Sequence, residues 1–139
     1  MTRKFWISTL VIFVLAMALD FVHHGILLHS DYAQLPSLFR TEADGAQYMP
    51  WMLLAHLVLA GAFVWMYQRG REDRPWLGQG LRFALAVSLL AIVPGYLIYY
   101  AVQPMPGMLV AKQIVFDTIR TLIIGVVVAA MNKQSAPQA

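Results

Sequence analysis

The sequence predicts an all-α integral membrane protein whose four transmembrane helices form an up-down-up-down bundle, with both termini in the cytoplasm. Of its 139 residues, 60% are hydrophobic and only 12% are charged. Four apolar segments each approach or exceed the roughly 20 residues that cross a bilayer. A soluble domain of this length cannot bury so much apolar surface. The composition therefore excludes a soluble enzyme, and the absence of cysteine excludes thiolate metal sites.

The apolar segments and their boundaries indicate one membrane domain without internal repeats. We expect a single domain over residues 1–139, with spans at residues 5–28, 49–67, 76–102 and 108–131. The first span begins like a cleavable leader, but its apolar run continues past the small residues at 16–18, so we expect it to be retained. Within the third span, Pro94 removes a backbone donor and is expected to kink the helix.

The basic residues cluster at alternate ends of the predicted spans. The connections expected in the cytoplasm carry six of them: Arg3, Lys4, Arg69, Arg71, Arg74 and Lys133. The opposite connections carry Arg40 alone. The positive-inside rule then places both termini in the cytoplasm. Although the net charge is +3, no basic face is present to bind nucleic acid, so the expected surroundings are membrane lipids and other membrane protein subunits, or further copies of this chain.

The connections and the small residues predict how the helices are joined. The outer loop 30–47 is the longest connection, and Leu35, Leu38 and Phe39 within it suit a short turn on the membrane surface. The tail 134–139 is expected to be solvated. Small residues favour close helix contact in membranes, and the candidates are Gly61, Ser88, Ala91 and Gly125.

Several ionisable residues lie within the predicted spans, where each costs about 2.5–3.5 kcal/mol to insert. Counting a rise of about 1.5 Å per residue from the outer helix ends places His24 level with His56, and Asp20 level with Asp117. Asp20, His23 and His24 share one helix face because they are three and four residues apart. Such costs require that each group has a partner or a function.

One interpretation of these residues is a structural polar core. Asp117 and Arg120 are three residues apart and can pair within the fourth span, or Asp20 can share Arg120. Interhelical polar contacts of this kind fix the register of neighbouring helices.

A second interpretation is a metal site near the outer face. Met49, Met52 and His56 lie on one helical stripe, and Asp20, His23 and His24 are the further candidate ligands. Thioether with imidazole suits Cu(I), whereas imidazole with carboxylate suits zinc or Cu(II), and copper is the first choice. A haem held by His56 and one of the two adjacent histidines is a less favoured variant.

A third interpretation is a proton or ion pathway through Asp20, His24, His56 and Asp117. Lys112 and Arg82 lie close enough to helix ends to extend to the interface.

No catalytic constellation is visible, so the chain is not expected to be an enzyme. We therefore expect a non-catalytic accessory subunit of a larger membrane complex, with the metal site and the ion pathway as alternatives.

Three short stretches resemble a group of short bacterial four-helix membrane proteins. They are residues 20–28 at the end of the first span, residues 78–82 at the start of the third, and the corner at residues 100–104. The resemblance implies the four-helix architecture and a location in the inner membrane. It implies no activity, cofactor or site residue.

Overall fold

Every regular element in the computed structural model, which describes residues 2–133, is helical. The predicted solvated tail, 134–139, lies outside the described residues. In chain order the elements are α1 (Arg3–Asp20), η1 (Phe21–Leu27), α2 (His29–Ala33), α3 (Glu42–Ala46), α4 (Met49–Gly70), α5 (Trp76–Val87), η2 (Ser88–Ile92), α6 (Val93–Val102) and α7 (Gly107–Met131). Here η1 and η2 are π-helical.

Four helical segments are long and apolar enough to cross a membrane, which confirms the four predicted helices. They cover Arg3–Leu27, Met49–Gly70, Trp76–Val102 and Gly107–Met131. The first joins α1 to η1, and the third joins α5, η2 and α6. Pro94 lies in the first turn of α6, where its missing N–H costs little, and the π-helical turn η2 directly precedes it.

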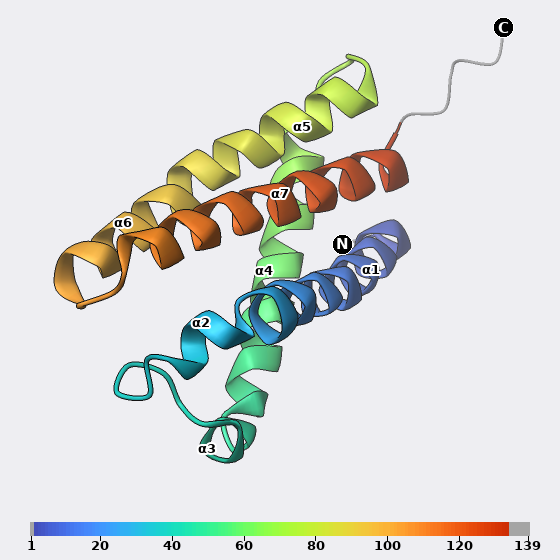
Figure 1. Ribbon diagram of the computed structural model, residues 1–139. Coiled ribbons are helices and arrows are strands. Elements are labelled where there is room, and N and C mark those ends of the chain that lie inside the picture. The colour runs from blue at the N-terminus through green and yellow to red at the C-terminus, as the bar shows by residue number, and fades with distance from the viewer. Residues whose placement is uncertain (1, 134–139) are drawn as a thin grey trace, which may run out of the picture.

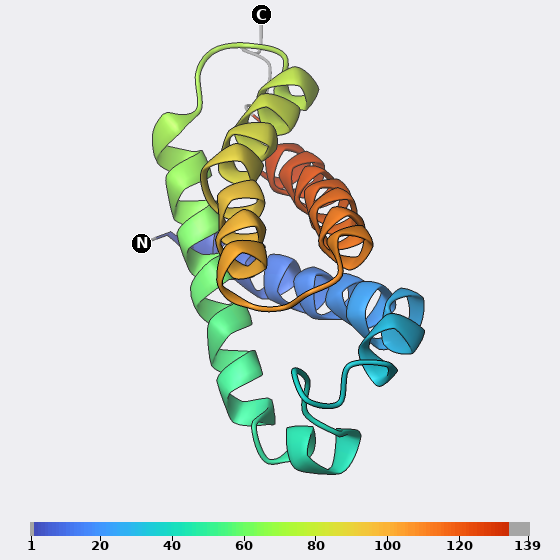
Figure 2. The ribbon, with the colours of Figure 1, turned by 60° about the vertical axis from the view of Figure 1, so that its left-hand side comes forward.

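The helices pack mainly as two pairs that meet along α7. In Figure 1, α5 and α7 run side by side, whereas α4 crosses α1 steeply. The same crossing is visible after rotation in Figure 2. At one end of the molecule, Asn132 accepts a hydrogen bond from Gln68 at 2.8 Å and donates one to Ser8 at 3.4 Å. These bonds join the start of α1, the end of α4 and the end of α7.

Two glycines allow α5 and α7 to approach closely. A Cβ atom added to Gly125 would lie 2.5 Å from the Cβ of Ala84, and one added to Gly80 would lie 2.6 Å from the Cβ of Ala129. Each helix thus contributes a pair of small residues four positions apart, a spacing that brings helix backbones together in membranes. Gly125 was predicted for this role and Gly80 was not, while Gly61 has no atom within 4 Å of its added Cβ.

The loop 30–47 folds back on the end of the helix bundle. Its Leu35, Leu38 and Phe39 pack against a small hydrophobic cluster of Leu28, Met105, Leu109 and Val110. The turn expected on the membrane surface stays a prediction. These side chains bury apolar area against the start of α7, and the ring centroids of Tyr32 and Phe39 lie 4.5 Å apart beside them.

The α5–α7 contact predicts opposite effects for the same substitution at two glycines. Gly125→Ala should lower the free energy of unfolding by about 1–3 kcal/mol because its methyl group overpacks the contact. Gly61→Ala is the matched control, and it should raise stability by about 0.5–1 kcal/mol because alanine favours the helix. Thermal unfolding of both variants in detergent measures the difference. Equal stability of the two variants would contradict the close contact.

Candidate functional site

Asp20, the last residue of α1, binds side chains from two other helices. Its Oδ1 accepts a hydrogen bond from Nη1 of Arg120 on α7. Its Oδ2 faces Nε2 of His56 on α4. The Arg120 and His56 residues are only 6% and 8% exposed, so these contacts lie inside the helix bundle. One carboxylate therefore connects three of the four spans.

His56 lies between two hydrogen-bond acceptors. Its Nδ1 lies 2.7 Å from the carbonyl oxygen of Met52, which only accepts hydrogen bonds. Its Nε2 faces the carboxylate of Asp20, which accepts in its ionised form. A neutral imidazole has one N–H for these two acceptors.

Asp117 on α7 is the second carboxylate of the cluster, and its two oxygens differ. Its Oδ2 accepts a hydrogen bond from the hydroxyl of Tyr96 on α6. Its Oδ1 has no hydrogen bond. Three nitrogens surround that oxygen: His23 Nδ1 at 3.7 Å, His24 Nε2 at 3.6 Å and Arg120 Nε at 3.6 Å. The nitrogens of His23 and Arg120 are themselves buried without a hydrogen bond.

The π-helical segment η1 brings both neighbouring histidines toward Asp117. In an α-helix, adjacent residues point about 100° apart, so only one of His23 and His24 would face the bundle. The wider π-helical turn changes this spacing, and such turns are frequent at functional sites. His23 stacks on Phe116 of α7 at 5.7 Å and is buried, whereas the His24 side chain is 34% exposed.

A chain of polar contacts connects the cluster to the outer loop. His24 Nδ1 lies 2.6 Å from the hydroxyl of Tyr32, which also accepts a hydrogen bond from Gln113 at 3.2 Å. Burial raises the pKa of Tyr32 to about 12, so its hydroxyl keeps its proton at neutral pH. Nearby, Lys112 binds Asp31 at 2.9 Å rather than only extending to the interface.

The structure groups the predicted residues differently from the two layers that the sequence suggested. His56 meets Asp20, and His24 lies near Asp117. The carboxylates of Asp20 and Asp117 do lie close together, since one ligand atom of each lies within 4.8 Å of the other. Arg120 contacts both Asp20 and Asp117, which joins the two pairings considered for it.

The two predicted methionine ligands lie apart from this arrangement. Met49 and Met52 are 44% and 49% exposed, and His56 contacts the backbone of Met52 rather than its sulfur. Sequence reasoning also missed Gln113 and Tyr96 as members of the cluster. Gln113 had a readable signal because it is four residues before Asp117 and shares its helix face. Tyr96 had none, since tyrosine near a helix end also suits an aromatic belt.

The charges and donors of the cluster define what it can do chemically. Two carboxylates face one guanidinium, which leaves one negative charge to be balanced by a proton or a cation. Asp20, His23 and Asp117 each offer one ligand atom, and these atoms lie within 4.8 Å of one another. The group can therefore fix the helices, exchange a proton or hold a small cation. Both ring nitrogens of His56, the histidine considered as one haem ligand, face hydrogen-bond acceptors.

The buried ion pair predicts a large stability loss from a single substitution. Arg120→Met should lower the free energy of unfolding by about 3–5 kcal/mol because Asp20 stays buried without its counter-charge. Asp20→Asn in the same chain should recover part of that loss, since the uncompensated charge is then removed. Thermal unfolding in detergent of the two single variants and the double variant tests this coupling. If the double variant loses as much stability as the two single variants together, the pairing of Asp20 with Arg120 is contradicted.

Comparison with known proteins gives no family for this arrangement. No protein-family model, no curated protein and no solved structure matches the chain.

Proposed function

We propose that this chain is a non-catalytic accessory subunit that docks to a larger assembly in the bacterial inner membrane. The observation that carries the proposal is the position of Arg82 on α5. Its side chain is exposed and makes no hydrogen bond or ion pair within the described part of the chain. Ionisable residues in membrane spans usually face the bundle interior and are paired. Arg82 does neither within this chain.

Helix geometry places Arg82 on the side of α5 opposite to α7. Gly80 and Ala84 contact α7, and Arg82 lies two residues from each, about 200° around the helix. It is six residues beyond Trp76, which corresponds to about 9 Å along the helix axis. A charge at this depth needs either a partner or an extended route to the interface.

The remainder of the third span is also largely uncovered. Only 11% of its most apolar window is buried, compared with 39% for the fourth span. Large apolar side chains on it are about half exposed or more, namely Leu89, Leu90, Leu97, Ile98, Tyr99 and Val102. Lipid chains or transmembrane helices of a partner would cover these side chains.

The chemistry of Arg82 indicates the kind of partner. A guanidinium forms its strongest contacts with carboxylate and phosphate groups, often through two parallel hydrogen bonds. We infer a partner span with an aspartate or glutamate near its cytoplasmic end. An anionic lipid offers a phosphate of similar charge, and the experiment below separates the two.

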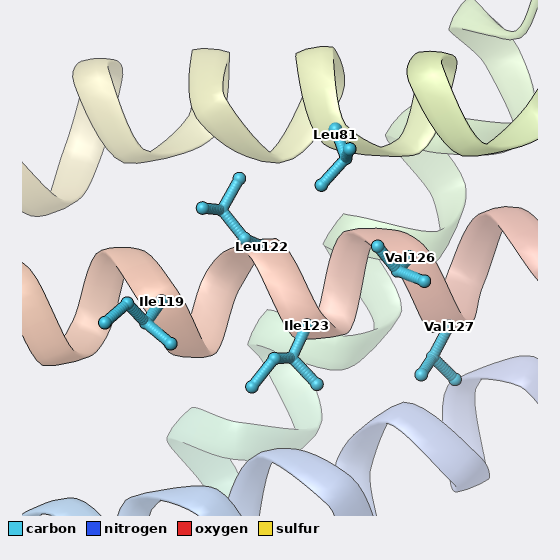
Figure 3. Close-up of a pocket in the computed structure, with 6 residues that line it drawn as sticks. All are labelled: Leu81, Ile119, Leu122, Ile123, Val126 and Val127. Atoms are coloured by element: carbon cyan, nitrogen blue, oxygen red, sulfur yellow. The ribbon is translucent and has the colours of Figure 1, made fainter.

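The apolar groove between α5 and α7 supplies no comparable signal. Its lining consists of Leu81, Ile119, Leu122, Ile123, Val126 and Val127. Figure 3 shows Leu81 and Leu122 pointing toward each other from the two helices. Because the lining is entirely hydrocarbon, lipid chains suffice to fill the groove.

The proposal includes an up-down-up-down topology with both termini in the cytoplasm. The asymmetry of the basic residues supports it, as does the hydrogen bond of 2.6 Å from Arg71 to the carbonyl of Asn132. That bond brings the connection between α4 and α5 together with the end of α7. The same end then carries most of the positive charge.

Single cysteines can test this topology because the chain has none of its own. Ser37→Cys in the outer loop should react with a membrane-impermeant maleimide added to intact spheroplasts. Asp73→Cys, between α4 and α5, should react only after the membrane is permeabilised. The opposite pattern would contradict the orientation.

Removing the charge of Arg82 should release the chain from its assembly. After gentle extraction of source membranes, the wild-type chain should migrate in native electrophoresis with a larger complex. Arg82→Leu should migrate at the mass of the chain itself, with an unchanged melting temperature. Arg74→Leu removes the same charge from the nearby loop, where Arg74 pairs with Glu72, and should stay in the complex.

The other outcomes of this experiment have defined meanings. A wild-type chain that migrates only as a single copy or as a small homo-oligomer would contradict the accessory role. An Arg82→Leu complex that stays intact but has lost bound anionic lipid would assign Arg82 to a lipid phosphate instead.

A further inference from the structure

Three side chains, of which His23 and Asp117 are buried and Asp20 is half-buried, converge on a common point. Asp20 and His23 come from the first span, and Asp117 comes from the fourth. One ligand atom from each lies within 4.8 Å of the others. The distance between His23 Nδ1 and Asp117 Oδ1 is 3.7 Å. Two ligands of tetrahedral zinc, each about 2.0 Å from the ion, lie about 3.3 Å apart.

Two of these atoms are buried without a hydrogen bond. They are Nδ1 of His23 and Oδ1 of Asp117, in residues that are 6% and 5% exposed. A buried polar atom without a partner costs about 1–3 kcal/mol, so each such atom calls for an explanation. A cation bound between them would satisfy both atoms with one ligand.

His24 extends the same site toward the outer surface. Its Nε2 lies 3.6 Å from Oδ1 of Asp117, and its Nδ1 contacts Tyr32 at 2.6 Å. When Nδ1 donates its hydrogen to the Tyr32 hydroxyl, Nε2 presents a lone pair toward Asp117. Histidines that bind metals usually have this kind of second contact, which fixes the tautomer and the ring orientation.

We propose that Asp20, His23 and Asp117 bind a divalent transition-metal ion, with zinc as the best match and His24 available as a fourth ligand. Imidazole combined with carboxylate favours zinc, and three protein ligands with one open position are a common zinc arrangement. This ligand set replaces the sulfur donors expected from Met49 and Met52. The proposed metal site does not depend on the proposal that a partner docks at Arg82.

The charges around the site are compatible with a cation despite the nearby Arg120. Two carboxylates exceed the single guanidinium by one negative charge, which a bound cation would offset. Each carboxylate oxygen has two lone pairs, so Asp20 can keep its contacts and still bind an ion.

The site also has a route from the outer side. The His24 side chain is 34% exposed, whereas His23 and Asp117 are buried beneath it. An ion entering from the outer surface reaches His24 before the other ligands. Toward the opposite end, the cluster of Ile12, Ala16, Phe63, Val64 and Ile124 closes the bundle with apolar side chains.

Zinc titration of the full-length protein tests the site directly. The purified chain in detergent is treated with a chelator, exchanged into chelator-free buffer and titrated with zinc alone. We expect one zinc ion per chain, and a rise in melting temperature with zinc concentration. His23→Gln should abolish stoichiometric binding and the thermal shift. Tyr32→Phe should weaken zinc affinity about 10–100-fold, because the contact that orients His24 is lost.

Matched variants keep this result interpretable. Met52→Leu changes an exposed side chain beside His56, and it should bind zinc like the wild type. If His23→Gln fails to fold, Asp117→Asn provides the equivalent test on α7. A wild-type chain that binds no zinc, or a folded His23→Gln chain that binds it normally, would overturn the proposal. Because these variants leave Arg82 unchanged, neither result tests the proposal that a partner docks at Arg82.

Discussion

The ion pair between Asp20 and Arg120 is the contact on which the arrangement of the spans depends. Each charge would be costly in an apolar interior, and each is compensated mainly by the other. Asp20 also holds His56, which adds the second span to the pair. On α7, Asp117 holds Tyr96 of the third span. Two carboxylates therefore connect all four spans near one level of the bundle. Moving any span along its axis breaks a contact to a buried charge, so the polar cluster sets the relative heights of the helices.

Packing and polar contacts divide this task between the two helix pairs. Lipid chains are as apolar as leucine, so helices in a membrane gain little from hydrophobic burial against one another. Close packing of small residues holds α5 to α7 through Gly80 and Gly125. The helices α1 and α4 cross steeply (Figure 1). Fully buried Ala16 and Ala60 lie in the hydrophobic core to which both helices contribute, and the Asp20–His56 contact adds a polar connection between them.

The sequence predicted the four spans because hydropathy depends only on composition over about 20 residues. Predicting the site also required the height of each residue along its helix and the direction of its side chain. Both depend on departures from a regular α-helix. The π-helical turn at residues 21–27 contains Gly25, but one glycine in an apolar helix does not distinguish a π-helical turn from an α-helical one, and this turn brings both His23 and His24 toward Asp117. Gly80 was not predicted as a packing position, because its partner Gly125 is distant in the sequence. The identity of the ionisable residues was thus predictable, but their pairing was not.

The contrast between Asp117 and Arg82 explains why one chain would carry two separate functions. Asp117 lies inside the bundle, where this chain itself supplies the donors that surround it. A ligand for that site must be small, since apolar side chains close the bundle on one side and only His24 is partly open on the other. Arg82 lies on the outside, where this chain supplies no acid within its described part. The group that we propose to balance it is a carboxylate of a partner span, with a lipid phosphate as the alternative. An interior site for an ion and an exterior site for a partner can act independently, because the Gly80–Gly125 contact holds α5 in place between them.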